Sequence, residues 1–255
     1  MPQLNGKVAI VTGGAQGIGR HYARGLAGEG ARIAIGDVVD CAPAVQEIAE
    51  KHGANSCLGL KLDVSDEASV RSFVAQVAER FGRIDILVNN AALCAALRPV
   101  PTAELDVELW DRVMAVNARG PFLMAKHVVP HMKAQGYGKI INISTGMAMR
   151  GVPGMLHYAT SKGAVLSITR CLSREVGQWG ICVNTIAPGL TVSETVMAQQ
   201  PEFMEMVRIP TNKSRSIQRD ERPEDLVGTV IYLASPASDF VTGQTILVDG
   251  GSLNN

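Results

Sequence analysis

The sequence predicts an α/β protein built on a parallel β-sheet with helices on both faces. Short β-rich runs alternate with helical patterns of about 10–16 residues through the first third of the chain, which is typical of βαβ units. A glycine-rich turn at residues 13–19 separates the first strand pattern from the first helical pattern. A strand, a tight turn and a helix in that order form a phosphate-binding element. The expected fold is therefore one that binds a phosphorylated ligand.

Size and charge narrow the class. The 255 residues, 46% of them hydrophobic, suffice for a large domain with a buried core. Residues 7–92 contain no linker, repeat or low-complexity segment, and we expect a single domain over residues 1–255. The 24 basic and 24 acidic residues cancel, so the charge gives no reason to expect a nucleic acid or an anionic membrane as partner.

The targeting and cysteine patterns indicate a cytoplasmic protein. No apolar run approaches the roughly 18 residues of a membrane span, and the first residues lead into a strand pattern without signal-peptide features. The five cysteines form an odd number without Cys-x-x-Cys spacing. This suits free thiols in a reducing compartment, and we expect neither a disulfide nor a metal site.

The first strand pattern, residues 7–12, leads into a turn that contains Gly13, Gln16, Gly17, Ile18 and Gly19. Its glycines allow backbone N–H groups to approach a pyrophosphate, whose charge the N-terminus of the next helix favours. The spacing is Gly-x-x-x-Gly-x-Gly rather than the commoner Gly-x-Gly-x-x-Gly. A plain tight turn is the alternative, but the flanking strand and helix favour a dinucleotide site.

The second strand pattern, residues 31–36, ends at Asp37. An acidic side chain here can accept hydrogen bonds from the adenosine ribose of NAD and would repel the 2′-phosphate of NADP. Gln16 offers no positive charge against that repulsion, although Arg20 and Arg32 are near in sequence. NAD is therefore the expected cofactor, unless Asp37 is an ordinary surface residue.

Two further βα units follow. A helical pattern over about residues 43–52 precedes a strand pattern at 58–62, which ends in Asp63-Val64. Ser65 is a natural N-cap for a helix over residues 66–81. The fourth strand pattern, residues 84–88, closes with Asn89-Asn90-Ala91-Ala92. A long helical pattern over about residues 104–132 then carries Asn117 on an apolar stretch. An asparagine inside a helix often has a specific partner, and a core amide satisfied locally is an equal alternative.

The clearest chemistry follows the strand pattern at residues 139–143, which ends at Ser144. Tyr158 and Lys162 are four residues apart in a helical pattern that extends to about Trp179, so they share a helix face. A free phenol titrates near ~10, and a cation held beside it lowers that pKa. We therefore expect the pair to transfer a proton.

The last third contains a strand pattern at residues 182–186, which ends in Ala187-Pro188-Gly189. Residues 190–219 are the least regular part of the chain, as is typical of a lid or binding loop, and we expect them to bind the substrate. A helix from Arg222-Pro223 to Ser235 and a strand at residues 245–248 complete the expected elements.

Together these motifs resemble the short-chain dehydrogenase/reductase family over essentially the whole chain. The resemblance is carried by Thr12-Gly13-x-x-x-Gly17-x-Gly19, Asp63-Val64, Asn89-Asn90-Ala91, Asn117, Ser144, Tyr158-x-x-x-Lys162, Pro188-Gly189 and Asp249-Gly250-Gly251. It implies a Rossmann-like, doubly wound sheet of about seven parallel strands and a homotetramer. It also implies hydride transfer between a nicotinamide and an alcohol or carbonyl carbon, in class EC 1.1.1.-.

The resemblance further implies roles for single residues. Tyr158 would be the general acid/base, Ser144 would hydrogen-bond the substrate oxygen, and Lys162 would bind the nicotinamide ribose. Asn117 would hold a water that connects Lys162 to solvent. Contacts to the rest of the cofactor are implied for Asp63 and Val64 (adenine), Asn90 (the adjoining ribose), and Pro188 and Gly189 (nicotinamide). The family commonly has a threonine at the position of Ser193 and a β-branched aliphatic residue at that of Thr191. Both side chains here carry a hydroxyl, and either could contact the cofactor amide.

The expected substrate pocket comprises Ser144, Cys94, Met147, Leu156 and Met197. Apart from Ser144, these side chains are apolar or sulfur-containing, which favours a bulky apolar or aromatic ketone over a sugar or an acid. As plain core residues they would need no ligand. We therefore expect an NAD-dependent oxidoreductase that acts on a secondary alcohol or ketone.

Two alternatives remain open. An NADPH-dependent 3-oxoacyl-thioester reductase is disfavoured by Asp37 and by the lack of a strongly basic patch for an acidic carrier protein. A non-catalytic NAD-binding sensor or scaffold on the same fold would have no physical need for Asn117, Ser144, Tyr158 and Lys162 together.

Overall fold

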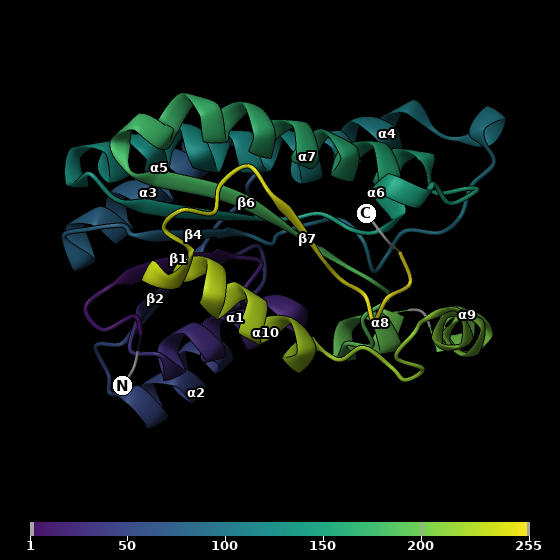
Figure 1. Cartoon of the computed structure of the whole chain (residues 1–255), viewed down its shortest axis with the longest axis horizontal. Coiled ribbons are helices and arrows are strands. Elements are labelled where there is room, and N and C mark those ends of the chain that lie inside the picture. Colours follow the sequence, from purple (N-terminus) through teal and green to yellow (C-terminus); the bar gives the residue numbers. More distant parts are fainter. Residues whose placement is uncertain (1–2, 200, 254–255) are drawn as a thin grey trace.

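The computed structural model describes residues 3–199 and 201–253. Seven parallel strands form one sheet in the order β3-β2-β1-β4-β5-β6-β7 (Figure 1). The strands are β1 (Val8–Thr12), β2 (Arg32–Asp37), β3 (Cys57–Lys61), β4 (Ile86–Asn89), β5 (Gly138–Ile143), β6 (Ile181–Pro188) and β7 (Thr245–Val248). The predicted α/β class, the parallel sheet and the seven strands are confirmed.

Helices cover both faces of this sheet. They are α1 (Gly17–Gly28), α2 (Ala42–His52), α3 (Glu67–Phe81), α4 (Val107–Met114), α5 (Gly120–Gln135), α6 (Met147–Arg150), α7 (Leu156–Val176), α8 (Glu194–Gln199), α9 (Pro201–Ser214) and α10 (Pro223–Ala234). Figure 1 shows α1, α2 and α10 on one face and α3, α5 and α7 on the other. Within the described residues, no helix combines the length and the apolar character needed to span a membrane.

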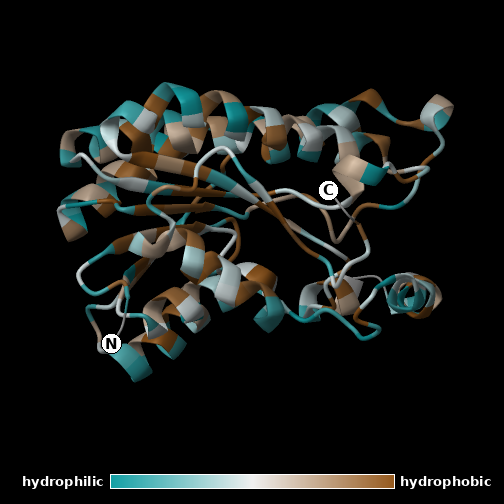
Figure 2. Ribbon diagram, in the orientation of Figure 1, coloured by the Kyte–Doolittle hydropathy of each residue, from teal (hydrophilic) through white to brown (hydrophobic). Residues whose placement is uncertain are grey.

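The core lies between the central strands and these two helix layers. Every residue of β1, β4, β5 and β6 is buried, as expected for parallel strands that are covered on both faces. Figure 2 shows mostly apolar strands between helices in which polar and apolar residues alternate. Each fully buried aliphatic side chain, such as Ile10 or Ile35, contributes about 1.5–3 kcal/mol of transfer free energy to this core.

The start of α3 differs from the prediction by one residue. The N-cap is Asp66, whose Oδ1 accepts a hydrogen bond of 3.0 Å from the Ala68 amide. The Ser65 hydroxyl instead donates to the Asp63 carboxylate at 2.6 Å. Ser65 as N-cap was therefore wrong, because a carboxylate two residues before it competes for its hydroxyl.

The predicted helix over residues 104–132 is interrupted. A 3-10 turn (Thr102–Glu104) precedes α4, and a π-helical turn (Ala115–Arg119) joins α4 to α5. Pro121, directly after this turn, has no backbone N–H to donate to the carbonyl of Asn117, so one bond of the regular ladder is missing here. Asn117 therefore lies in the π turn, where its neighbours are not those of an α-helix.

Residues 190–219 are more regular than predicted, because α8 and α9 occupy most of them. Pro201 is the first residue of α9, a position that tolerates proline, and Met204 anchors the helix with 1% exposure. Met206 and Ile209 are 65% and 60% exposed, which hides the helical periodicity in the sequence. The loop assignment was wrong for these residues, and the expected substrate-binding role stays a prediction.

Candidate active site

The predicted site residues converge on the carboxyl edge of the sheet. The segments that leave this edge include the glycine-rich turn after β1, Asp37 at the end of β2, Asp63 and Val64 after β3, Asn90 after β4, Ser144 after β5 and Gly189 after β6. The strand order reverses between β1 and β4: the chain adds β2 and β3 on one side of β1, and β4 to β7 on the other side. Ligands of open parallel sheets bind in the crevice at such a reversal.

The glycine-rich turn requires glycine at two positions for different reasons. Gly17 has a φ of +54°, a conformation that L side chains rarely adopt. A Cβ on Gly19 would collide with the carbonyl oxygen of Gly13 and lie 2.5 Å from Nδ2 of Asn90. Asn90 Nδ2 itself donates to the carbonyls of Thr12 and Gly13, both at 3.0 Å. The turn is therefore held close to the end of β4.

The N-terminus of α1 faces α8 across this turn. Gln16 occupies the N-cap position, but its side chain makes no capping hydrogen bond. It therefore accepts from none of the first amides of α1, including that of Ile18. The Gly17 amide donates to Oε1 of Glu194 on α8 at 3.0 Å. A carboxylate of the chain therefore lies where a helix N-terminus favours an anion.

Asp37 lies at the end of β2, beside the glycine-rich turn. Its carboxylate is buried, with Oδ2 accepting from the Ala15 amide at 3.1 Å and Oδ1 from the Val39 amide at 3.3 Å. These bonds tie the end of β2 to the glycine-rich turn. Asp37 is thus a fixed negative charge beside the turn.

Arg20 and Arg32, which both follow the turn in sequence, make their contacts elsewhere. Arg20 pairs with Glu47 at 2.7 Å, and the Arg32 guanidinium lies 5.2 Å from the ring centre of Phe81. Neither contact is to Asp37. Lys61, the register neighbour of Asp37 on β3, is exposed.

Asp63 and Val64 have different surroundings. The Asp63 carboxylate is exposed and accepts hydrogen bonds from the amide and the hydroxyl of Ser65. Val64 is buried, and its side chain packs against Gly120 at the start of α5. Val64 thus offers an apolar wall, while the Asp63 oxygens are partly used within the turn.

Ser144, Tyr158 and Lys162 come together at the end of β5, and all three are buried. The Ser144 hydroxyl donates to the backbone carbonyl of Lys162 at 2.8 Å. Lys162 Nζ donates to the carbonyl of Ile143 at 2.8 Å, so the ammonium is held under the strand end. The structure thus places Ser144 against the backbone of Lys162, while Tyr158 and Lys162 both lie near the Cys94 thiol, and the catalytic roles of these residues stay a prediction.

Asn117 has specific partners rather than a free amide. Its Oδ1 accepts from the Leu93 amide at 2.8 Å, and its Nδ2 donates to the Leu93 carbonyl and to the Ser161 hydroxyl. Ser161 in turn donates to the carbonyl of Tyr158 at 2.7 Å. Asn117 thus ties the loop after β4 to the helix that carries Tyr158, and the predicted water contact to Lys162 stays a prediction.

The titration behaviour differs from the sequence prediction. Burial raises the pKa of Tyr158 well above its ordinary value, and the nearby Cys94 thiol adds to this. Burial also lowers the pKa of Lys162 to about 8. The expected lowering of the Tyr158 pKa by the ammonium was therefore wrong for the protein alone, because burial acts in the opposite direction.

The surroundings of Tyr158 are mostly apolar. Tyr158 packs with Leu97, Val113 and Met155, and the partly buried Cys94 and Met147 join this group. Burial raises the pKa of the Cys94 thiol, while its contact with the Tyr158 hydroxyl opposes that rise. The other two predicted pocket residues are outside this apolar group, and their role stays a prediction. Leu156 is 42% exposed, and Met197 is half-buried on α8.

The segment that leaves β6 is fixed by hydrogen bonds to Gly146 and Glu221. The Gly146 amide donates to the Pro188 carbonyl at 3.0 Å, and the Thr191 hydroxyl donates to Oε1 of Glu221 at 2.7 Å. Ser193 is buried, and its hydroxyl accepts from the Val196 amide at 3.4 Å. Thr191 is therefore directed toward Glu221.

Three residues at the site were missed in the sequence. Ser161 carries a usable signal, because it lies between Tyr158 and Lys162 on the same helix. Arg215 and Glu221 have no local signal, since their partners at residues 190–191 are 25 and 30 positions away.

Comparisons with known proteins agree with this geometry. A family model described as enoyl-(acyl carrier protein) reductase matches residues 13–252. The chain is 38% identical over 258 residues to a sorbitol dehydrogenase of Cereibacter sphaeroides, with 98% of each chain covered. It is 37% identical over 245 residues to a cis-4-hydroxycyclohexanecarboxylate dehydrogenase of Sinomonas cyclohexanicum, with 96% of each covered. The crystal structure of levodione reductase matches with a TM-score of 0.91 and 31% identity, over 96% of this chain and 97% of that one.

Proposed function

This chain belongs to the short-chain dehydrogenase/reductase family, and from that premise we propose that it transfers a hydride between NAD(H) and a secondary alcohol or ketone. Membership makes it an oxidoreductase of alcohols or ketones that uses a nicotinamide dinucleotide. One observation carries the finer proposal. Ser144, Tyr158 and Lys162 are buried together at the same sheet edge as the glycine-rich turn.

The residues of the crevice fit a dinucleotide. Gly19 has no space for a Cβ, and the α1 N-terminus favours an anion. The proposed cofactor contacts are Gly13, Gln16, Gly17, Ile18 and Gly19 for the pyrophosphate, Asp37, Asp63, Val64 and Asn90 for the adenosine half, and Tyr158, Lys162, Pro188, Gly189, Thr191 and Ser193 for the nicotinamide half. NAD is proposed over NADP because Asp37 is a fixed carboxylate, while Arg20 and Arg32 make other contacts.

Tyr158 is the proposed general acid/base. The Ser144 hydroxyl holds the substrate oxygen. In oxidation Tyr158 takes the hydroxyl proton as the phenolate, which Lys162 and the positive ring of bound NAD⁺ would favour, and in reduction the phenol returns that proton. Lys162 favours the phenolate while it is charged. Because its pKa is lowered to about 8, it carries that charge below this pH and loses it above. NAD(H), when bound, supplies the hydride chemistry.

The proposed substrate is an apolar or aromatic secondary alcohol or its ketone. The support is the apolar group around Tyr158, which includes Leu97, Val113 and Met155. A relative at 37% identity is named for a hydroxycyclohexane acid, which makes ring alcohols the first choice. A relative at 38% identity is named for sorbitol, so polyols belong in the same test.

A thioester reductase is the second candidate. The matching family model is described as enoyl-(acyl carrier protein) reductase, so a substrate carried by an acyl carrier protein belongs among the candidates. Its 3-oxoacyl form with NADPH would require that Asp37 tolerate a 2′-phosphate. The cofactor preference of the purified enzyme separates the two candidates.

A substrate panel tests this proposal. We expect NADH formation from NAD⁺ with cyclohexanols and 1-phenylethanol, and a kcat/KM with NADP⁺ at least about tenfold lower. Oxidation of sorbitol and of a hydroxy acid, and reduction of an acetoacetyl thioester by NADPH, are measured in parallel. Turnover of sorbitol or the hydroxy acid alone would refute the apolar substrate, and strict use of NADPH would favour the thioester reductase. NAD⁺ binding without turnover of any substrate would favour a sensor.

Replacing Glu194 by alanine is expected to tighten NAD⁺ binding about fivefold. The Glu194 carboxylate occupies the Gly17 amide that the pyrophosphate would use, and one such hydrogen bond is worth about 1 kcal/mol. Fluorescence titration with NAD⁺ and NADH measures the change. Glu202→Ala, which removes the same charge from the exposed side of α9, is the matched control. Unchanged or weaker binding in the Glu194 variant would show that the contact does not compete with the cofactor.

Three further points belong to the proposal. A homotetramer is implied by the family, and gel filtration with light scattering tests it. A single domain over residues 1–255 is supported by the one continuous seven-stranded sheet. The role of residues 190–219 in substrate binding is part of the proposal and is tested by the substrate panel. A cytoplasmic location is supported by the free state of all five cysteines.

A further inference from the structure

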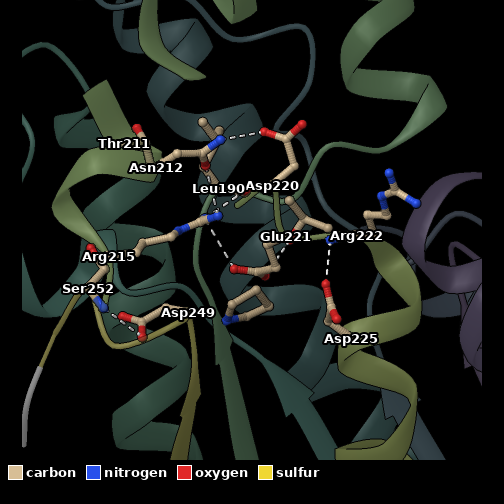
Figure 3. A network of polar contacts seen from close by, with 12 residues as sticks. Leu190, Thr211, Asn212, Arg215, Asp220, Glu221, Arg222, Asp225, Asp249 and Ser252 are labelled. Carbon is tan, nitrogen blue, oxygen red and sulfur yellow. Dashed lines mark hydrogen bonds and ion pairs between the residues drawn. The ribbon is translucent and has the colours of Figure 1, made fainter. Parts of the chain in front are cut away.

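A buried ion pair lies behind the loop that leaves β6, which we call the β6 loop (residues 188–191). Arg215 is the residue directly after α9, and Figure 3 shows its side chain directed toward Leu190 and Glu221. Its side chain is 1% exposed. Nη2 donates to the Leu190 carbonyl at 2.9 Å and pairs with Oε2 of Glu221 at 3.3 Å, and Nη1 donates to the Arg219 carbonyl at 3.1 Å. Arg215 therefore joins the β6 loop to the end of α9.

Glu221 also forms hydrogen bonds to the β6 loop and to the residue that follows it. Its Oε1 accepts from the Thr191 hydroxyl at 2.7 Å, and its backbone carbonyl accepts from the Val192 amide at 2.8 Å. A Cβ on Gly189 would lie 2.6 Å from Oε2 and 2.9 Å from Nη2 of Arg215. The ion pair thus packs directly against the backbone of Gly189, with no intervening side chain.

The C-terminal turn completes the arrangement. The Ile217 amide donates to the Gly250 carbonyl at 2.8 Å, and the Gly189 amide donates to the Val248 carbonyl at 3.1 Å. Asp249 accepts from the backbone amides of residues 251–253. The β6 loop is therefore fixed between the sheet, the end of α9 and the turn after β7.

This arrangement has a consequence for the reaction that rests on the proposed function. Residues 188 and 189 are the proposed nicotinamide contacts, and hydride transfer depends steeply on the distance and angle between the reacting carbons. A loop held only by backbone bonds to β7 could shift by a fraction of an ångström. We propose that Arg215 and Glu221 are positioning residues that set where the β6 loop holds the nicotinamide relative to Tyr158.

A double-mutant cycle separates positioning from folding. Replacing one partner leaves a buried unpaired charge, whereas replacing both leaves a neutral interior. We expect Arg215→Met and Glu221→Gln alone to lower Tm, and Arg215→Met/Glu221→Gln to recover most of that loss. In the double variant we expect kcat to stay at least tenfold lower, with the Kd of NAD⁺ within threefold and a larger deuterium isotope effect on the alcohol. Recovery of kcat together with Tm would overturn the proposal, because the pair would then be structural only.

Two milder variants test the proposal if the Arg215 and Glu221 variants do not fold. Thr191→Val keeps the shape and removes the donor to Glu221, and Thr191→Ser keeps the hydroxyl. We expect about a fivefold lower kcat for Thr191→Val at a Tm within about 3 °C of the wild type, and a kcat at least threefold higher for Thr191→Ser than for Thr191→Val. Because Thr191 is also a proposed cofactor contact, the Kd of NAD⁺ is measured in both variants and is expected to stay within threefold of the wild type. Equal kcat values for the two variants would overturn the proposal.

Two controls make failures distinguishable. Arg219 forms an exposed pair with Asp225 at 2.7 Å in the same segment, and Arg219→Met is expected to change kcat less than twofold. The emission of bound NADH is measured in every variant, because it reports the nicotinamide environment without turnover. If the wild type binds NADH but oxidises no alcohol, the proposed function fails. Altered emission in the double variant would then still support positioning, and unaltered emission would refute it.

Discussion

Replacing Tyr158 by phenylalanine is expected to lower kcat for alcohol oxidation by about 10³-fold, because general acid–base catalysis contributes about 10²–10⁴-fold. The variant loses only the hydroxyl, and its ring keeps the contacts with Leu97, Val113 and Met155. The Kd of NAD⁺ is expected to stay within about threefold and Tm within about 3 °C. Steady-state kinetics, cofactor titration and thermal unfolding of the same preparation measure all three.

Tyr232→Phe is the matched control for that prediction. Tyr232 is 40% exposed on α10, so loss of its hydroxyl is expected to leave kcat within twofold. If Tyr158→Phe keeps more than a tenth of the wild-type kcat, Tyr158 is not the general acid/base. If it loses NAD⁺ binding as well, the phenol is a cofactor contact more than a proton carrier.

The fold could be predicted because its signals are local. The strand patterns, the glycine-rich turn and the helix that carries Tyr158 each follow from residues within a few positions of one another. Tyr158 and Lys162 share a helix face for the same reason. Ser144 joins them because the end of β5 lies beside α7, which parallel-sheet topology already requires.

The rest of the site depends on contacts that the sequence does not encode locally. The π turn around Asn117 is set by Pro121 together with partners at Leu93 and Ser161 from other segments. The pKa of Tyr158 is raised because tertiary packing buries the phenol, and helix spacing alone does not reveal burial. Thr191 meets Glu221 only because the segment after α9 returns to β6.

Replacing Asp37 by asparagine is expected to change the ratio of kcat/KM for NAD⁺ and NADP⁺ about 100-fold toward NADP⁺. The carboxylate accepts hydrogen bonds from the Ala15 and Val39 amides, and an amide side chain keeps one oxygen for these bonds. Loss of the second acceptor weakens the turn that holds NAD⁺, and loss of the charge removes repulsion of a 2′-phosphate. Two unit charges about 4 Å apart interact by about 4 kcal/mol near a protein surface, so a 100-fold change, about 2.7 kcal/mol, lies within that range.

The neighbouring Asp40 supplies the control for this experiment. Asp40 is exposed, and its Oδ1 accepts from the Ala42 amide at 2.9 Å, so Asp40→Asn removes one negative charge close to Asp37 without altering the glycine-rich turn. We expect the cofactor ratio to change less than threefold in that variant. Equal changes in the two variants would mean that general charge near the adenosine end decides the preference. No change in Asp37→Asn would mean that the hydrogen-bond geometry of the turn excludes the 2′-phosphate, whatever charge stands at the end of β2.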